Sequence, residues 1–222
     1  HGTIQIVAEL DGERVLRTDV HCGYLHRGFE KEAEAHTYHN VIPYTDRLNY
    51  CSSFINNVGY CRTVEQMLGI EAPPRAVWAR TILSEFSRIM DHCGCNGSTL
   101  VDLGALTNFW YFFQPREEIY GLLESVCGSR LTVSANRIGG LLAELPSTFE
   151  AHCRRLLEFI PPLMDDVETL VAKNRIFMDR AVGIAAMSGN GWHLLFRVDL
   201  PNDHDALALV SGVLAALAAR FD

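Results

Sequence analysis

The stretch from residue 42 to residue 69, IPYTDRLNYCSSFINNVGYCRTVEQMLG, constrains the fold of this chain more than any other. It opens with a proline and a Thr-Asp pair, which can cap a helix, and it closes at Gly69, where a helix can end. Between these signals, apolar residues recur at roughly helical spacing: Leu48, Cys51, Ile55, Val58, Val64 and Leu68. The pattern predicts one long, largely buried helix.

Three functional side chains lie in the first turns of this predicted helix: Asp46, Arg47 and Tyr50. A phenol can hydrogen-bond a ligand carbonyl, and a buried phenol usually needs a polar partner. Two interpretations follow from the residues alone. Tyr50 is either a core tyrosine satisfied within the protein or a ligand-binding tyrosine at the start of the helix.

Composition limits the classes of function. The chain has 222 residues, 48% of them hydrophobic, which is enough for a sizeable core. A formal net charge of -8 argues against a general nucleic-acid binder, because phosphate neutralisation needs a basic face. The longest apolar run, residues 206–219, is shorter than the ~20 residues of a spanning helix, so any membrane association is expected to be peripheral. No signal peptide is visible at His1, which begins inside a strand pattern and suggests an internal position of a longer parent.

The cysteines are odd in number and scattered, which favours free thiols in a reducing compartment over a disulfide framework. Two groupings hint at metal: Cys93 and Cys95 beside His92, and His21-Cys22 with His26. Neither has paired CxxC spacing, so no metal site is expected.

The remaining patterns predict an α+β fold that is mainly α, with a short N-terminal antiparallel β-hairpin packed on a bundle of long helices. The hairpin turns at Asp11-Gly12. The predicted elements are strands at 3–10 and 14–20, helices at 31–39, 73–92, 115–126 and 148–172, and a nearly all-apolar segment at 99–113. Gly94 and Gly97 are expected to end the second long helix, and Pro161-Pro162 to interrupt the last one.

The chain is expected to divide into three regions: an N-terminal β region at 1–30, a helical body at 31–186 and an atypical tail at 187–222. The tail begins with a turn cluster, SGNG, followed by a short strand pattern and an Ala/Leu-rich helix. The tail resembles a fragment of phage- and plasmid-type primase-polymerases, whose SGNGxHL motif would place a catalytic histidine at His193. No acidic metal-binding strand precedes it, so no activity is assigned to the tail.

Two further motifs stand out. Asp102 is one acid within the apolar segment, and a buried carboxylate is costly unless it is paired, so we expect a donor from elsewhere in the fold. That donor is either structural or part of a functional site. The sequence RIGG at 137–140 predicts a turn that permits close backbone approach.

Residues 1 to about 186 resemble the D subunit of the respiratory NADH:quinone oxidoreductase, complex I, a family related to the large subunit of nickel-iron hydrogenases. The matching stretches keep the family order: His1-Gly2, GYLHRGFEK at 23–31, IPYTDRL at 42–48, VDLGALT at 101–107, RIGG at 137–140 and NRIF at 174–177. The resemblance implies a subunit that forms the quinone-reduction site beside a partner's terminal iron-sulfur cluster and couples electron transfer to proton translocation.

The resemblance also implies which residues act. The quinone headgroup would lie between His1 and Tyr50, and Asp102 would partner the histidine, so these three would be catalytic. A Tyr O–H and an imidazolium can supply protons to the two quinone oxygens, and a carboxylate fixes the imidazole tautomer. Arg47 would lie near the partner's iron-sulfur cluster.

The chain would itself bind no cofactor, but it would belong to an enzyme with NAD binding among its functions. Its substrate would be a quinone such as ubiquinone. Its partners would be other subunits of this translocase, namely the iron-sulfur and membrane-arm subunits, with no nucleic acid among them. It would sit peripherally on the cytoplasmic side of the inner (plasma) membrane, and the isolated chain would be inactive in electron transport.

The chain also departs from the family. The family segment before His1 is absent, Asn49 replaces an aspartate, and Leu131–Ser134 replaces a stretch that carries a histidine pair. The hydrogenase CxxC pairs are absent too, so no nickel-iron site is expected. The missing histidine pair, the missing first segment and the atypical tail favour an alternative, a truncated or paralogous scaffold subunit without quinone chemistry. Nucleic-acid binding through the tail is a third hypothesis, which the acidic charge disfavours.

Overall fold

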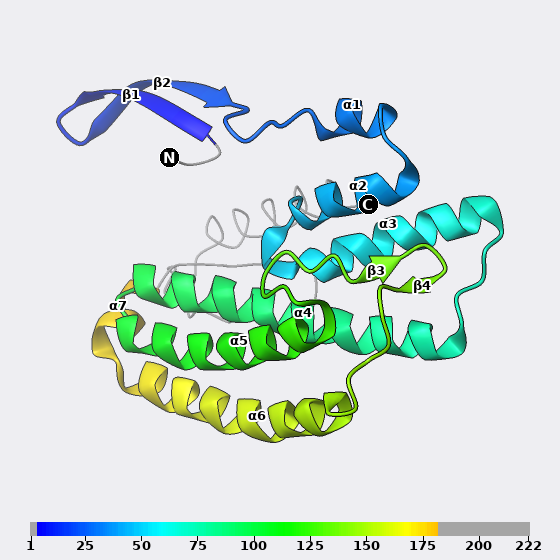
Figure 1. The fold of residues 1–222 in the computed structure, drawn as a ribbon. Coiled ribbons are helices and arrows are strands. Elements are labelled where there is room, and N and C mark those ends of the chain that lie inside the picture. The colour runs from blue at the N-terminus through cyan, green and yellow to red at the C-terminus, as the bar shows by residue number, and fades with distance from the viewer. Residues whose placement is uncertain (1–3, 182–222) are drawn as a thin grey trace, which may run out of the picture. The chain divides into compact units, whose positions relative to one another are not determined.

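A computed structural model describes residues 4–181 of the chain. His1 and the predicted tail, with its strand, helix and His193, lie outside the described residues. Over the described range the chain is mainly α-helical and has one N-terminal antiparallel hairpin, so the predicted fold class is confirmed (Figure 1). The described residues form two compact units, each assembled from separate stretches of sequence: 4–87 with 123–145, and 88–122 with 146–181.

The first unit contains the hairpin, three short helical elements, one longer helix and a small second sheet. In chain order these are β1 (Ile4–Asp11), β2 (Arg14–Cys22), α1 (Phe29–Glu34), α2 (Tyr38–Asp46), the 3-10 turn η1 (Tyr50–Ser52), α3 (Ser53–Leu68), β3 (Asn136–Arg137) and β4 (Gly140–Leu141). The N-terminal half of α4 (Pro74–Asp102) and the C-terminal end of α5 (Leu106–Cys127) complete it.

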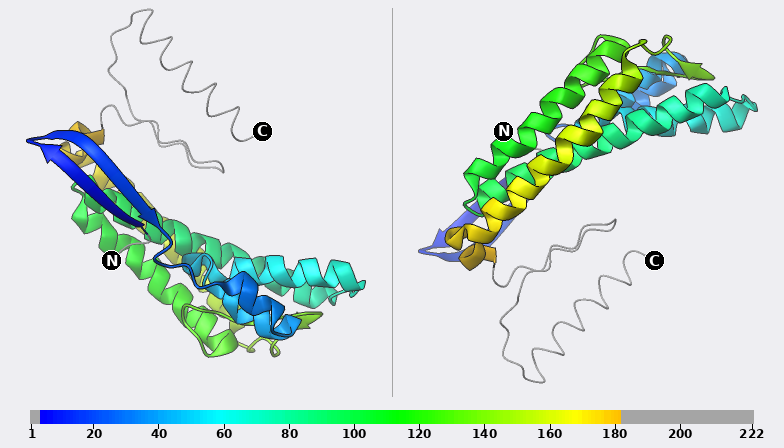
Figure 2. Two further views of the ribbon diagram at one scale, coloured as in Figure 1. Left: turned by 90° about the horizontal axis from the view of Figure 1, so that it is seen from above. Right: turned by 90° about the horizontal axis from the view of Figure 1, so that it is seen from below.

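The second unit is helical. It contains the C-terminal half of α4, most of α5, α6 (Phe149–Lys173) and α7 (Arg175–Ala181). In the right-hand view of Figure 2, α5 (green) and α6 (yellow) are visible as two long rods.

The N-terminal hairpin is amphipathic and uncovered. Ile4 pairs with Cys22, Ile6 with Val20 and Ala8 with Thr18, which places a mostly apolar set of side chains on one face of the ribbon. All residues of both strands are nevertheless exposed. Because a two-stranded hairpin is marginal without a covered apolar face, this ribbon needs more protein than the described residues supply.

The prediction of one continuous helix from residue 42 to residue 69 is wrong. Helix α2 begins before the stretch, contains Pro43 and ends at Asp46, and η1 separates it from α3. The Ile42 carbonyl accepts hydrogen bonds from Thr45 Oγ1 at 2.7 Å and from Asn57 Nδ2 at 3.3 Å. These side chains satisfy a carbonyl near the end of α2, so the chain can break there without leaving the Ile42 carbonyl unpaired.

The break changes which face of α3 is buried. The buried residues are Ser53, Phe54, Asn57, Cys61, Val64 and Glu65, whereas Leu48 and Leu68 are exposed. The predicted end of the helix at Gly69 is confirmed, because Gly69 adopts the left-handed conformation with a φ of 66°.

Three predicted breaks in the other helices are also wrong. Helix α4 runs through Gly94 and Gly97, α5 begins before Pro115, and α6 continues through Pro161 and Pro162. A Cβ on Gly97 would lie 3.3 Å from Phe112 Cβ, and one on Gly94 would lie 3.5 Å from the Arg116 guanidinium. These glycines therefore allow close packing of α4 against α5 within the second unit.

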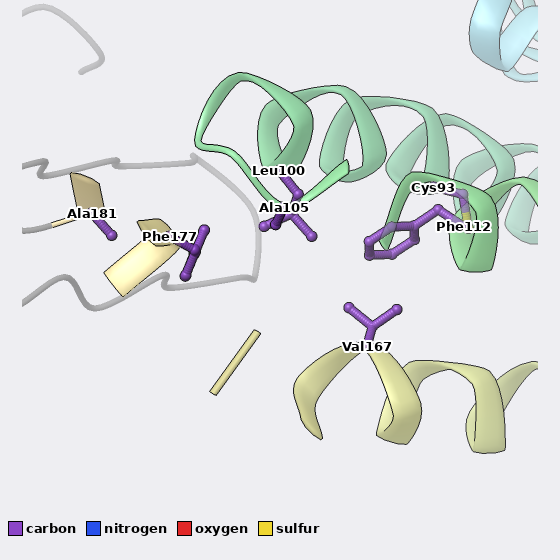
Figure 3. Packing of buried hydrophobic residues seen from close by; sticks show 7 residues of the cluster. All are labelled: Cys93, Leu100, Ala105, Phe112, Val167, Phe177 and Ala181. Atoms are coloured by element: carbon purple, nitrogen blue, oxygen red, sulfur yellow. The ribbon is translucent and has the colours of Figure 1, made fainter. Parts of the chain in front are cut away.

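The core of the second unit is an apolar cluster drawn from all of its helices. Buried residues of α4, α5, α6 and α7 and of the turn after α4 meet there: Cys93, Leu100, Ala105, Phe112, Val167, Phe177 and Ala181 (Figure 3). This burial stabilises the helices, because burying a Leu, Val or Phe side chain is worth roughly 1.5–3 kcal/mol.

Candidate functional site

Tyr50 lies at the junction between α2 and α3, as the first residue of η1. It is 54% exposed, so the interpretation of a buried core tyrosine is wrong. Among the described residues, no side chain or carbonyl forms a hydrogen bond with its hydroxyl. The phenol is therefore available to an acceptor outside the described chain.

The junction that carries Tyr50 is held by local hydrogen bonds. Asn49 Nδ2 donates to Ser52 Oγ at 2.6 Å, and the Asn49 carbonyl accepts from Asn56 Nδ2 at 3.1 Å. Ser53 Oγ donates to the Leu131 carbonyl at 2.6 Å. These contacts tie η1 to the first turn of α3 and tie α3 to the loop that follows α5.

Arg47 lies three residues before Tyr50 and is half-exposed. Its Nη1 donates to the Pro43 carbonyl at 2.7 Å and lies 3.4 Å from Asp46 Oδ2. The guanidinium is therefore anchored at one end while part of it faces solvent.

Asp46 is fully buried behind Arg47. Burial raises the pKa of this carboxyl, and a hydrogen bond with Asn57 and the positive charges of Arg47 and Arg137 offset only part of that effect. Asp46 Oδ1 has no hydrogen-bond partner among the described residues. A buried acid with a raised pKa beside an anchored cation is typical of a functional region, although structural ion pairs have the same signature.

A second polar network lies behind the RIGG turn. Arg80 donates from Nη1 to Glu65 Oε2 at 3.0 Å and from Nη2 to Glu65 Oε1 at 2.6 Å. The same Nη2 donates to the Arg137 carbonyl at 2.8 Å and the Gly140 carbonyl at 3.0 Å, and Gly139 N donates to Glu65 Oε1 at 2.7 Å. The predicted turn is confirmed, and Gly139 has a φ of 86°.

Nothing in the sequence predicts the Glu65–Arg80 pair. Its members stand 15 positions apart and belong to different helices, α3 and α4. The one available signal was RIGG, which identified the turn but not the pair that holds it.

Asp102 is exposed, so the expectation of a buried, paired acid is wrong. Because α4 continues past its two glycines, Asp102 becomes the last residue of that helix, while its neighbours Leu100 and Ala105 enter the core. Within residues 4–181, no hydrogen bond or ion pair reaches its carboxylate.

The proposed convergence of the catalytic residues stays a prediction. His1 lies outside the described residues, Tyr50 belongs to the first unit and Asp102 to the second. The structure does bring Tyr50 and Arg47 together on one short segment.

Metal and membrane features are absent from the described range. No three His, Cys, Asp or Glu side chains of residues 4–181 gather where a metal ion could be held. In that same range, no helix has the length and apolar character required to cross a membrane. All seven cysteines are free thiols.

Comparison with known families places the chain in a class. Residues 102–192 match the family model described as respiratory-chain NADH dehydrogenase, 49 kDa subunit. The chain is therefore related to one component of a respiratory oxidoreductase.

Individual relatives specify the component. The chain is 49% identical over 188 residues to the D subunit of the NADH-quinone oxidoreductase of Pelobacter propionicus, an alignment that covers 85% of this chain and 47% of that protein. It is also 49% identical over 188 residues to the C/D subunit of the Bdellovibrio bacteriovorus enzyme, covering 85% of this chain and 34% of the relative. The D subunit from Flavobacterium johnsoniae is 45% identical over 188 residues, an alignment that covers 85% of this chain and 46% of that protein.

The predicted resemblance to the D subunit of NADH:quinone oxidoreductase is thus confirmed over most of the chain. The chain spans about half the length of these D-subunit relatives, and less of the C/D protein.

Proposed function

We propose that this chain forms part of the quinone-reduction site of an NADH:quinone oxidoreductase, as its D subunit. The observation that supports the proposal is Tyr50. In a chain related to the D subunit, its phenol is exposed and available for hydrogen bonding on a segment held by local hydrogen bonds. A tyrosine in that state can donate to a carbonyl oxygen of a bound ring.

The reaction requires two electrons and two protons for each quinone reduced to quinol. Tyr50 donates a hydrogen bond, and ultimately a proton, to one quinone oxygen, and a protonated His1 serves the other. Asp102 orients the imidazole and stabilises its cationic form. When the imidazole gives up its proton, the aspartate loses its counter-charge, and this local change is the event proposed to drive proton translocation.

The electrons arrive from a partner protein of the complex. Within residues 4–181 no group of cysteines gathers to hold a cluster, and the iron-sulfur cluster, when bound by the partner, would supply electrons one at a time. Arg47 would lie near that cluster, where its fixed positive charge would favour the reduced state. In this proposal the complex carries the chain peripherally on the cytoplasmic side of the membrane and oxidises NADH elsewhere in the assembly.

The test is a Tyr50→Phe substitution in the assembled enzyme. We expect slower quinone turnover, by roughly 10²–10⁴-fold if the phenol acts in proton transfer, and weaker binding of a quinone analogue. Tyr38→Phe is the matched control, because Tyr38 is a similarly exposed tyrosine (51%) of the same unit. Unchanged turnover and analogue affinity in the Tyr50 variant would contradict the proposal.

A scaffold subunit without quinone chemistry is the second candidate. The uncovered apolar hairpin face favours it, because that face is suited to docking. This candidate predicts that Tyr50→Phe and Asp102→Asn leave turnover unchanged, while charged substitutions at Ile6 and Val20 reduce assembly of the complex.

A further inference from the structure

The turn that ends α4 directly follows Asp102, the last residue of that helix. Gly104 N donates to the Val101 carbonyl at 2.9 Å, and Ala105 N donates to the Leu100 carbonyl at 2.7 Å. Gly104 has a φ of 90°, in the left-handed region that favours glycine. The backbone around Asp102 is therefore a hydrogen-bonded turn with a defined conformation.

Helix α7 packs on this turn through Asn174, the residue before its first turn. Asn174 Nδ2 donates to the Gly104 carbonyl at 3.3 Å, and Asn174 Oδ1 accepts from Phe177 N at 3.0 Å. One side chain thus caps α7 and binds the turn. Phe177 enters the same apolar cluster as Ala105, as Figure 3 shows.

The contact leaves little room for a side chain at Gly104. A Cβ on Gly104 would lie 2.9 Å from Arg180 Nη1 and 3.0 Å from Ile176 Cγ2, both of α7. The backbone of the turn and α7 therefore pack in direct contact.

We propose that Asn174 is a positioning residue for Asp102, acting through the Gly104 carbonyl. The inference rests on the proposed function, in which Asp102 orients an imidazole. Because Asp102 is exposed and has no polar partner within residues 4–181, the backbone that carries it determines where its carboxylate lies. Catalytic geometry must be held to within about 0.5 Å, and Asn174 supplies the side-chain hydrogen bond from α7 that fixes this backbone.

Substitutions at Asn174 separate its two roles. Asn174→Ser keeps an oxygen that can cap α7, as serine does at many helix starts, but it is too short to reach Gly104. Asn174→Ala loses both interactions. A capping role alone predicts that the serine variant behaves like the parent, whereas the positioning role predicts that both variants are impaired.

The experiment measures kcat, KM and their pH dependence with a short-chain quinone, in the assembled enzyme. For Asn174→Ser we expect kcat to fall by about three- to tenfold, KM to stay within about twofold, and the pH profile of kcat to shift. In an Asp102→Asn background the same substitution is expected to have no further effect on kcat, because the group it positions is already gone. Recovery of assembled complex shows that each variant folds.

Two outcomes would overturn the inference while leaving the proposed function intact. One is a serine variant with the parent's kcat and pH profile. The other is a double variant whose loss of kcat equals the product of the losses caused by Asn174→Ser and Asp102→Asn alone. An Asp102→Asn variant with unchanged kcat and pH profile is a different result. It would contradict the role of Asp102 itself, and the inference would fall with it.

Discussion

Arg80 and Glu65 form a buried ion pair joined at two points, with the guanidinium and the carboxylate 3% and 8% exposed. The pair also holds the backbone of the RIGG turn. Arg80 donates hydrogen bonds to two backbone carbonyls of the turn, and Glu65 accepts one from a backbone amide of the turn. Removing one member leaves the other charge buried and unpaired.

We therefore expect Glu65→Gln to lower the free energy of unfolding by about 3–5 kcal/mol. The double variant Glu65→Leu with Arg80→Met is expected to be less destabilised than the two single losses added together, since it leaves no buried charge. Urea denaturation of the parent, the single variants Glu65→Leu and Arg80→Met, and the double variant measures the coupling energy between the two residues. Strict additivity would show that the pair does not act as a unit.

Stability should also depend on pH through Glu65. Burial opposes its charge, but the hydrogen bonds from Arg80 and Gly139 and the charge of Arg80 prevail and hold the pKa of this carboxyl below its ordinary value of 4.5. A carboxyl with a lowered folded-state pKa stabilises the fold above the unfolded-state value. This stabilisation is expected to be full above that value and to disappear as pH falls through the lower folded-state pKa. Unfolding curves across acid pH measure it, and Glu65→Gln should lose this part of the pH dependence.

The buried Asp46 should change the pH dependence of stability in the opposite direction to Glu65. Its raised pKa means that folding is penalised when the carboxyl is ionised, so Asp46→Asn is expected to increase stability at neutral pH. The gain should disappear as pH falls through the raised pKa toward the ordinary value of 3.8, where both proteins are neutral at this position. Thermal denaturation at several pH values tests this. A variant less stable than the parent at neutral pH would show that pairing with Arg47 outweighs the burial cost.

The two glycines of the RIGG turn should respond differently to alanine. Gly139 has a φ of 86°, whereas Gly140 does not have a positive φ and an added Cβ there meets nothing within 4 Å. Gly139→Ala is expected to cost about 1–2 kcal/mol, and Gly140→Ala to change stability much less. Chemical denaturation compares the matched pair. Equal losses would indicate that the left-handed conformation is not what the turn requires.

Much of the architecture followed from local sequence patterns. Asp11-Gly12 located the hairpin, Gly69 the end of α3 and RIGG a turn, because each depends on conformations that a few neighbouring residues dictate. The ordered motifs also identified the family correctly.

Helix continuity was harder to predict. Gly94, Gly97 and Pro115 are local helix breakers, yet the helices continue through all three. Packing energy is summed over whole helices, so it can exceed the cost of a single unfavourable residue.

The sequence by itself determined the family, the α+β class and the identity of Tyr50, Arg47 and Asp102 as candidates. Only the tertiary structure decided that Asp102 is exposed, that Asp46 is buried, and that Glu65 meets Arg80 and Asn174 meets Gly104. The physical reason is that these outcomes depend on contacts between residues distant in sequence, and burial and pairing arise from such contacts rather than from local preference.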